Sequence, residues 1–181
     1  NPIFAQQLAS LADVYVNDAF GTAHRAHAST VGVATYLPSF AGFLMAKEIK
    51  ALDGLIIDPK RPFISIIGGA KISGKIEILE RLTEISDKLL IGGGMAYTFI
   101  AAQGFEIGKS IWEDKQVDFV KKLMAKSQES SKKIIIPKDV HVSGDFSINS
   151  ESHIVPIAEI GEHELGMDIG EKTIDEFKKI I

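Results

Sequence analysis

Four short, largely apolar runs of strand length, rich in Ile, Val, Leu and Phe, constrain the fold of this chain most strongly; they lie at positions 14–16, 63–67, 89–91 and 134–136. Longer stretches with helical periodicity separate these runs, so the expected order of elements is βαβα. Strands that are apolar on consecutive positions, and not only on alternate ones, suit a parallel sheet that helices cover on both faces. We therefore predict an α/β fold with parallel sheets of the Rossmann-like type.

The segments between and around these runs have the pattern of helices, and several start directly after glycines or polar loop residues. The expected helices cover residues 4–12, 43–55, 75–86, 96–102, 115–127 and 172–181. Residues 149–156 and the segment around Gly166 are expected to form short strands and turns.

The strand and helix patterns break between positions 31 and 42, where glycine and proline residues interrupt an otherwise apolar stretch. We interpret this break as a domain boundary. Residues 1–36 are then expected to close one domain, and residues 37–55 to form a connector with a helix. Residues 56–181 are expected to belong to a second α/β unit.

A glycine corner at positions 63–75 runs from an expected strand through Gly68 and Gly69 into an expected helix. Glycines there let backbone N–H groups approach an anion closely, and the positive end of the helix dipole adds to the attraction. Lys71 and Lys75 lie four residues apart, and a helix that begins near Lys71 would bring both ammonium groups to one face. The corner is therefore a candidate phosphate-binding site.

The same segment also matches, at residues 69–75, the GxxxxGK part of a Walker A loop. That motif needs a Ser or Thr hydroxyl at the next position to hold magnesium, and this chain has Ile76 there. Because an isoleucine cannot ligate a metal, we reject the ordinary P-loop interpretation, while a site made of backbone groups and lysines remains. The alternative for this segment alone is a tight turn with solvated lysines.

A second glycine corner, Gly92 to Gly94, repeats the design one βα unit later. Two such corners would open at the carboxyl ends of neighbouring parallel strands, where open α/β sheets bind ligands. The spacing does not fit the dinucleotide fingerprint GxGxxG, because Tyr97 stands where the last small residue is needed. Taken alone, this corner suits packing as well as binding, and the segment around Gly166 is first interpreted as a plain turn.

A basic island, with His24, Arg25 and His27, stands among small residues of an otherwise acidic chain. Arginine offers a planar fork of donors and histidine can add another, so the island suits a phosphate or carboxylate ligand. The alternative is that Arg25 pairs with Asp18 and that the histidines cap a loop. Neither histidine has the acidic or thiolate companions of a metal site, so no metal is expected here.

The composition excludes several other classes of protein. A net charge of -4 argues against a general nucleic-acid surface, and the lack of cysteine excludes disulfides and thiolate chemistry. No apolar run approaches the roughly 18 residues of a membrane-spanning helix, and residues 1–4 lack the features of a signal peptide. We expect a cytosolic or organellar protein whose ends, Asn1 and Ile181, are cut from a longer chain.

These motifs, in this order, resemble those of the phosphoglycerate kinase family, and the likeness covers the whole chain. The first block, from Tyr15 to His27, is highly specific by itself. Gly74 departs from the family pattern, because an acidic residue is common at that position. The further matching blocks are Gly42 to Met45, Gly68 to Lys71 with Lys75, Ile91 to Ala96, Glu106 to Ser110, and Gly166 to Gly170.

The resemblance implies a two-domain α/β kinase, of which only part is present. Such an enzyme transfers a phosphoryl group between 1,3-bisphosphoglycerate and ADP in glycolysis, with ATP or ADP and Mg²⁺ and no metal ligand within this chain. The resemblance also implies small-molecule substrates, no nucleic-acid or membrane partner, a monomeric state and a cytoplasmic location. By position, Gly21, His24 and Arg25 fall in the family's 3-phosphoglycerate patch. The implied nucleotide-binding positions are Gly69, Ala70, Lys71, Lys75, Gly93, Gly94, Ile111 and Gly166.

The implied catalytic residues are Lys75, Lys71 and Arg25, which would align the substrates and neutralise charge on the transferred group without a covalent intermediate. Because parts of both substrate sites would lie outside residues 1–181, we expect this chain alone to lack kinase activity. Two other classes stay open. A dinucleotide-binding oxidoreductase would need GxGxxG and an acidic residue about 20 positions further on, and the chain could also be a non-catalytic interaction fragment.

Overall fold

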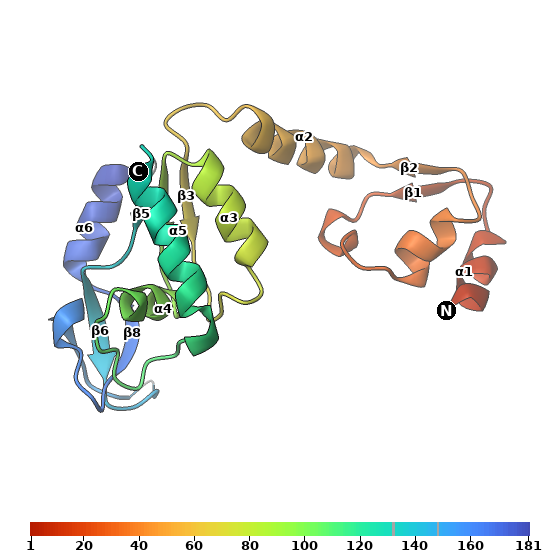
Figure 1. The fold of residues 1–181 in the computed structure, drawn as a ribbon. Coiled ribbons are helices and arrows are strands. Elements are labelled where there is room, and N and C mark those ends of the chain that lie inside the picture. Colours follow the sequence, from red (N-terminus) through yellow and green to blue (C-terminus); the bar gives the residue numbers. More distant parts are fainter. Residues whose placement is uncertain (132, 148) are drawn as a thin grey trace. The chain divides into compact units, whose positions relative to one another are not determined.

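The computed structural model describes residues 1–131, 133–147 and 149–181. The chain divides into two compact units, Asn1–Lys60 and Arg61–Ile181 (Figure 1). The long helix expected at positions 43–55 is present and belongs to the first of these units.

The first unit combines a two-stranded parallel sheet with two α-helices. Its strands pair with Tyr15 opposite Ser39 and Asn17 opposite Ala41. In chain order the elements are α1 (Pro2–Ala9), β1 (Tyr15–Asn17), the 3-10 helix η1 (Phe20–Thr22), the π-helix η2 (Ala28–Gly32), β2 (Ser39–Ala41) and α2 (Phe43–Ile57).

Side chains outside the helices fix where both α-helices of this unit begin. Asn1 Oδ1 accepts the N–H of Phe4 at 3.3 Å, and Pro2 takes the first helical position, where no N–H partner is needed. Asp18 Oδ1 accepts the N–H of Met45 at 3.0 Å and so caps α2 from the loop after β1. The first helix therefore begins and ends earlier than its periodicity predicted.

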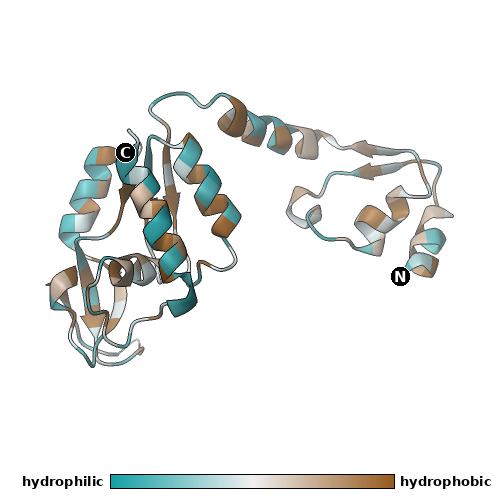
Figure 2. Ribbon diagram, in the orientation of Figure 1, coloured by the Kyte–Doolittle hydropathy of each residue, from teal (hydrophilic) through white to brown (hydrophobic). Residues whose placement is uncertain are grey.

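Several large apolar side chains of the first unit stay at its surface. Val16 and Phe40 on the paired strands are more than half exposed, and Phe43 at the start of α2 is 97% exposed. Both strands are hydrophobic (brown in Figure 2), although parallel strands are ordinarily covered on both faces. This unit thus leaves part of the apolar surface of β1, β2 and α2 uncovered.

The second unit contains a three-stranded parallel sheet in the order β3, β4, β5. The strands predicted at 63–67, 89–91 and 134–136 are confirmed to within one residue at each end. The elements are β3 (Ile64–Ile67), α3 (Ile76–Ile85), β4 (Lys88–Ile91), α4 (Met95–Ala102), the 3-10 helix η3 (Asp114–Gln116), α5 (Val117–Glu129) and β5 (Lys133–Ile135).

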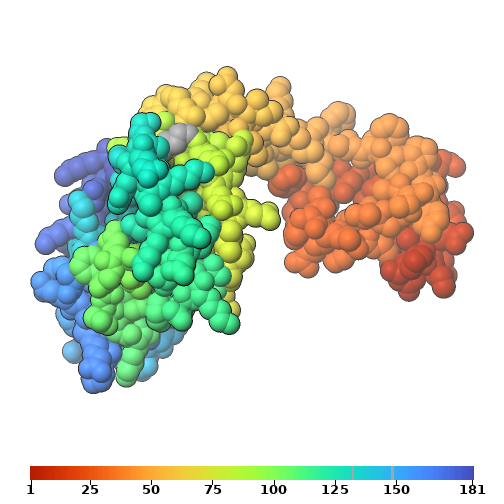
Figure 3. Space-filling view, in the orientation of Figure 1, coloured from red at the N-terminus to blue at the C-terminus, as the bar shows by residue number. Residues whose placement is uncertain are grey.

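Helices α3, α4 and α5 pack their apolar faces against this parallel sheet. Leu79 of α3, Phe99 of α4 and Val120 of α5 are fully buried together with Leu89 and Ile91 of β4. In the space-filling view, α3 (yellow-green) and α5 (teal) lie at the surface on this side of the unit (Figure 3). Burying each such side chain contributes about 1.5–3 kcal/mol, so the cluster holds the strand ends and their loops in place.

An antiparallel sheet in the order β7, β6, β8 follows, and the sequence pattern did not predict its central strand. The short strands expected at 149–156 and around Gly166 are confirmed, but Gly166 lies within a strand and not in a turn. The elements are β6 (Asp139–Ser143), β7 (Ser152–Pro156), the 3-10 helix η4 (Ile157–Glu159), β8 (Leu165–Ile169) and α6 (Glu171–Ile180).

Candidate functional site

The two glycine corners lie side by side at the carboxyl ends of β3 and β4. These strands are parallel neighbours, with Ile67 opposite Ile91. The N–H of Met95 donates to Gly69 O at 2.7 Å, and the N–H of Gly92 donates to Ile67 O at 2.9 Å. The expected arrangement is confirmed, because both corners open at the same edge of the sheet, where such folds bind ligands.

Close contact between the corners requires glycine in the second one. Gly93 has a φ of +63°, and a Cβ there would lie 2.8 Å from Gly69 N. A Cβ on Gly94 would lie 3.3 Å from the Cα of Ala70. The absence of these side chains lets the two backbones touch.

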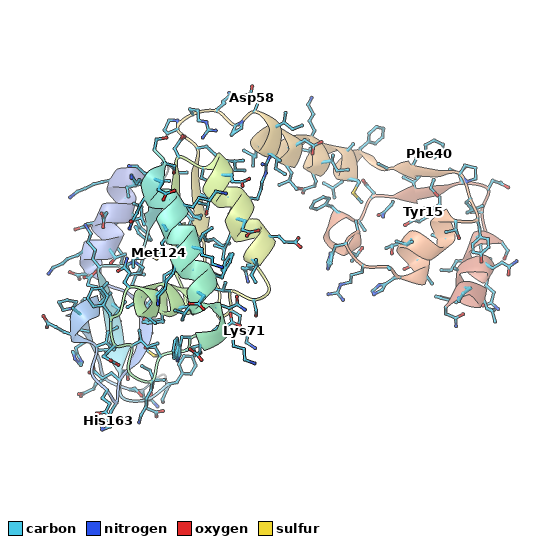
Figure 4. The ribbon with its side chains drawn as sticks, in the orientation of Figure 1. Tyr15, Phe40, Asp58, Lys71, Met124 and His163 are labelled. Atoms are coloured by element: carbon cyan, nitrogen blue, oxygen red, sulfur yellow. The ribbon has the colours of Figure 1, made fainter. Side chains whose placement is uncertain are left out.

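The two lysines of the first corner do not share a helix face, so the prediction from their spacing is wrong. Helix α3 begins at Ile76, and a turn in which the N–H of Lys75 donates to Ile72 O at 2.7 Å precedes it. Lys71 is exposed in the loop between β3 and α3, where Figure 4 labels it. Gly69 has a φ of +144°, and Lys75 Nζ lies 3.1 Å from where its Cβ would stand. The missing side chain thus makes room for an ammonium group above the backbone of the corner.

Glu113, which sequence reasoning missed, holds this loop. Its Oε2 accepts the N–H groups of Ile72 at 2.5 Å and of Ser73 at 2.9 Å, and its Oε1 accepts the Ser73 hydroxyl at 2.7 Å. These hydrogen bonds from Ser73, with smaller contributions from Ile72 and the charge of Lys71, hold the pKa of Glu113 below its usual range. No local pattern could reveal the contact, because 41 residues separate Glu113 from Ile72.

Gly166 lies in β8 and packs against the helix that follows the second corner. Its N–H donates to Ser110 Oγ at 2.9 Å, and a Cβ on Gly166 would overlap the ring of Tyr97 in α4. Burial, followed by the charge of Asp168, raises the pKa of Tyr97 to about 12, so its hydroxyl is protonated at neutral pH. Ile111 follows Ser110 and is 55% exposed, which leaves its side chain accessible to a ligand.

The basic island lies in the first unit, where Gly21, His24 and Arg25 are all exposed. Arg25 Nε donates to His24 Nε2 at 3.3 Å, and Thr30 Oγ1 donates to Arg25 O at 2.6 Å. Among the described residues Arg25 forms no ion pair with Asp18, whose carboxylate instead caps α2. The Asp18–Arg25 pair of the alternative interpretation is therefore wrong, whereas His27 is the N-cap residue of η2, which agrees with its other part, a capping role for the histidines.

Within residues 1–131, 133–147 and 149–181, no group of three or more His, Asp or Glu side chains is arranged to hold a metal ion. Over the same part of the chain, no helix combines the length and apolar character needed to cross a membrane. The polar groups that meet at the corners are backbone N–H and C=O groups of both loops and the ammonium group of Lys75.

An open parallel sheet with two touching glycine corners, and a lysine above one of them, defines a class of α/β proteins built to bind anions at strand ends. Comparison with known families identifies the member of that class. The model of the phosphoglycerate kinase family matches residues 1–181, and the chain belongs to this family.

Individual relatives agree with this assignment. The phosphoglycerate kinase of Enterococcus faecalis is 56% identical over 170 residues, which are 93% of this chain and 42% of that protein. The phosphoglycerate kinase of Chlorobium phaeobacteroides is 50% identical over 182 residues, which cover 100% of this chain and 46% of that protein. The solved structure of phosphoglycerate kinase from Coxiella burnetii is similar at a TM-score of 0.87 and 38% identity, over 99% of this chain and 46% of that one. The chain spans slightly less than half the length of these relatives.

Proposed function

We propose that the protein carrying this chain transfers a phosphoryl group reversibly between 1,3-bisphosphoglycerate and ADP, giving 3-phosphoglycerate and ATP in glycolysis. Family membership supports a phosphoryl-transfer enzyme. The structural observation that carries the proposal is the pair of touching glycine corners with Lys75 Nζ above Gly69. Such a corner offers backbone N–H donors and a cation to phosphate oxygens.

The nucleotide, in this proposal, lies along the edge formed by the carboxyl ends of β3 and β4. Its phosphates meet the exposed backbone and lysines of the first corner, and its adenosine lies against the second corner, the loop before η3 and β8. The close glycine contacts and the exposed side chain of Ile111 support this placement. The proposed contacts are Gly69, Ala70, Lys71 and Lys75 for the phosphates, and Gly93, Gly94, Ile111 and Gly166 for the adenosine.

The phosphoglycerate is proposed to bind at the basic island, through Gly21, His24 and Arg25. A guanidinium group recognises carboxylate and phosphate groups through two parallel hydrogen bonds, which suits a ligand that carries both. The exposure of all three residues and the hydrogen bond from Thr30 to the Arg25 carbonyl, which fixes the turn, support this assignment.

The proposed catalytic residues act by orienting the substrates and neutralising charge: Lys75 and Lys71 act on the phosphates of the nucleotide, and Arg25 acts on the phosphoglycerate. Mg²⁺ bound with the nucleotide would neutralise further phosphate charge, and the described residues include no group of side chains arranged to hold it. We also propose a monomeric, cytoplasmic enzyme whose partners are its small-molecule substrates, as family membership suggests.

The substitution Lys75→Ala in the full-length protein tests the catalytic assignment. In a coupled assay we expect kcat to fall about 10²–10³-fold, with a much smaller loss of nucleotide affinity, because the ammonium group acts mainly on charge in the transition state. The matched control is Lys122→Ala, at an exposed position of α5, which should leave kcat unaltered. An unchanged kcat in Lys75→Ala would show that its assigned role is wrong.

Calorimetry of residues 1–181 with ADP–Mg and with NAD separates the kinase from the oxidoreductase alternative. We expect tighter binding of ADP–Mg, and preferential binding of NAD would favour the oxidoreductase class. We also propose that this chain alone is inactive, since it spans less than half the length of its relatives. Turnover comparable to that of a full-length relative would contradict this last point.

A further inference from the structure

Glu113 contacts both the loop that follows the first glycine corner and the helix that follows the second. It stands in the segment between α4 and α5, one residue before η3. Its N–H donates to Thr98 Oγ1 at 3.1 Å, and Thr98 is a 1% exposed residue of α4. Because α4 starts directly after Gly94, the backbone of Glu113 is anchored to the helix of the second corner.

The side chain of Glu113 reaches the loop of the first corner. Its carboxylate accepts two backbone N–H groups, from Ile72 at 2.5 Å and Ser73 at 2.9 Å, and the Ser73 hydroxyl at 2.7 Å. Hydrogen bonds to an ionised carboxylate are about twice as strong as neutral ones. The residue therefore ties the loop of the first corner to the helix of the second.

The segment that Glu113 holds stands directly between the two lysines. Ile72 is fully buried in the core, so packing fixes the loop on one side while the carboxylate fixes its backbone on the other. Among the described residues neither Lys71 nor Lys75 forms an ion pair. Glu113 thus shapes the loop and leaves both ammonium groups available to a ligand.

We propose that Glu113 is a positioning residue, which holds the backbone of Ile72 and Ser73 so that Lys71 and Lys75 stand ready for the phosphates of a nucleoside diphosphate. This inference rests on the function proposed above for the first corner. The carboxylate acts through the loop and does not itself touch the nucleotide. Its loss should therefore weaken the binding of phosphate groups and spare the binding of the nucleoside.

The test compares the affinities of ADP and adenosine by calorimetry in full-length protein carrying Glu113→Ala, Glu113→Gln or Ser73→Ala. We expect Glu113→Ala to weaken ADP binding about tenfold and to leave adenosine binding unchanged, because the phosphate-binding loop loses its preorganisation. Glu113→Gln should recover most of the affinity, since its amide oxygen still accepts the loop N–H groups. Ser73→Ala should fall in between, because it removes the hydroxyl contact alone. Glu129→Ala, at the exposed end of α5, is the matched control.

Amide hydrogen exchange at Ile72 and Ser73 supplies a readout that does not depend on the nucleotide. We expect faster exchange at both amides in Glu113→Ala, with the rest of the unit unchanged. ADP affinity unaltered in Glu113→Ala, or ADP and adenosine affinities lowered by the same factor, would overturn the inference. Failure of the unaltered protein to bind ADP more tightly than adenosine would instead overturn the proposed function of the corner, and the inference with it.

Discussion

Replacement of Asp139 by alanine should destabilise the second unit, because its carboxylate caps α6 from a different strand. Asp139 is 2% exposed in β6, and its Oδ1 accepts the N–H of Thr173 at 2.8 Å and the Thr173 hydroxyl at 2.6 Å. Its Oδ2 accepts the N–H of Lys172 at 3.0 Å. Gly170, the residue before α6, has no side chain to offer these N–H groups, so Asp139 replaces the usual local cap.

The expected cost follows from these contacts. A hydrogen bond to a charged group contributes about 1.5–3 kcal/mol, and donors left buried without a partner add to the cost of truncation. Because the contacts share one carboxylate and are not additive, we expect Asp139→Ala to lower the free energy of unfolding by about 3–5 kcal/mol. Asp139→Asn keeps one acceptor oxygen and should cost about 1–2 kcal/mol.

The same carboxyl group should make stability depend on pH. Burial alone would raise the pKa of Asp139, but the hydrogen bonds from Thr173 and Lys172 outweigh it and the pKa lies below its usual value. A carboxyl whose pKa is lower in the folded state stabilises above the unfolded pKa, and this contribution is lost as the pH falls through the folded pKa. The difference between the unaltered chain and Asp139→Asn should therefore shrink as the pH drops below about 4.

Urea unfolding followed by Trp112 fluorescence measures these differences, since Trp112 is the single tryptophan and lies in the same unit. Asp145→Ala, at an exposed position after β6, is the control and should change stability by less than about 0.5 kcal/mol. A loss in Asp139→Ala no larger than that of Asp145→Ala would refute the reasoning. A difference in the free energy of unfolding between the unaltered chain and Asp139→Asn that grows as the pH falls would also refute it.

Three further substitutions test other contacts. Gly93→Ala should destabilise the second unit and weaken ADP binding in calorimetry, because its Cβ would lie 2.8 Å from Gly69 N at a φ of +63°. Phe99→Ala should lower the free energy of unfolding in urea by about 3–5 kcal/mol, since it leaves a cavity in the core of the second unit. Asp18→Ala should lower the free energy of unfolding of the first unit by about 1 kcal/mol, because the N–H of Met45 loses its cap. Urea unfolding followed by far-UV circular dichroism measures this loss, since Trp112 lies in the other unit. Wild-type values in any of these variants would contradict the contact that it removes.

The strands of the parallel sheet were predictable because runs such as 63–67 and 89–91 are apolar on both faces, which few other local structures explain. Strand β6 was not, since Asp139, His141 and Ser143 interrupt its apolar residues. Asp139 is buried because the N–H of Thr173, 34 residues further on, donates to its carboxylate, whereas the hydroxyl of Ser143 finds its partner locally, in the carbonyl of Asp145. A pattern of hydrophobicity cannot predict that a polar residue is buried when its hydrogen-bond partner lies in a distant segment.

The candidate site was likewise only partly predictable from the sequence. Glycines at strand ends and the lysines near them are local signals, so the sequence located the first corner, the second corner and the basic island. The four-residue spacing of Lys71 and Lys75 predicted that both lie on one helix face, which is wrong because α3 begins only at Ile76. Gly166 lies within a strand and faces the ring of Tyr97. Because glycine is common in turns, its residue type alone does not predict this position.

The sequence by itself determined the family, the βαβ order and the candidate residues for a phosphate site, since all of these depend on residue type and local spacing. Only the tertiary structure showed that Gly93 touches Gly69, that Lys75 Nζ stands above Gly69 and that Glu113 holds the loop between the lysines. Those contacts join segments far apart in the chain. Their geometry depends on how strands and helices pack, which a local sequence pattern does not predict.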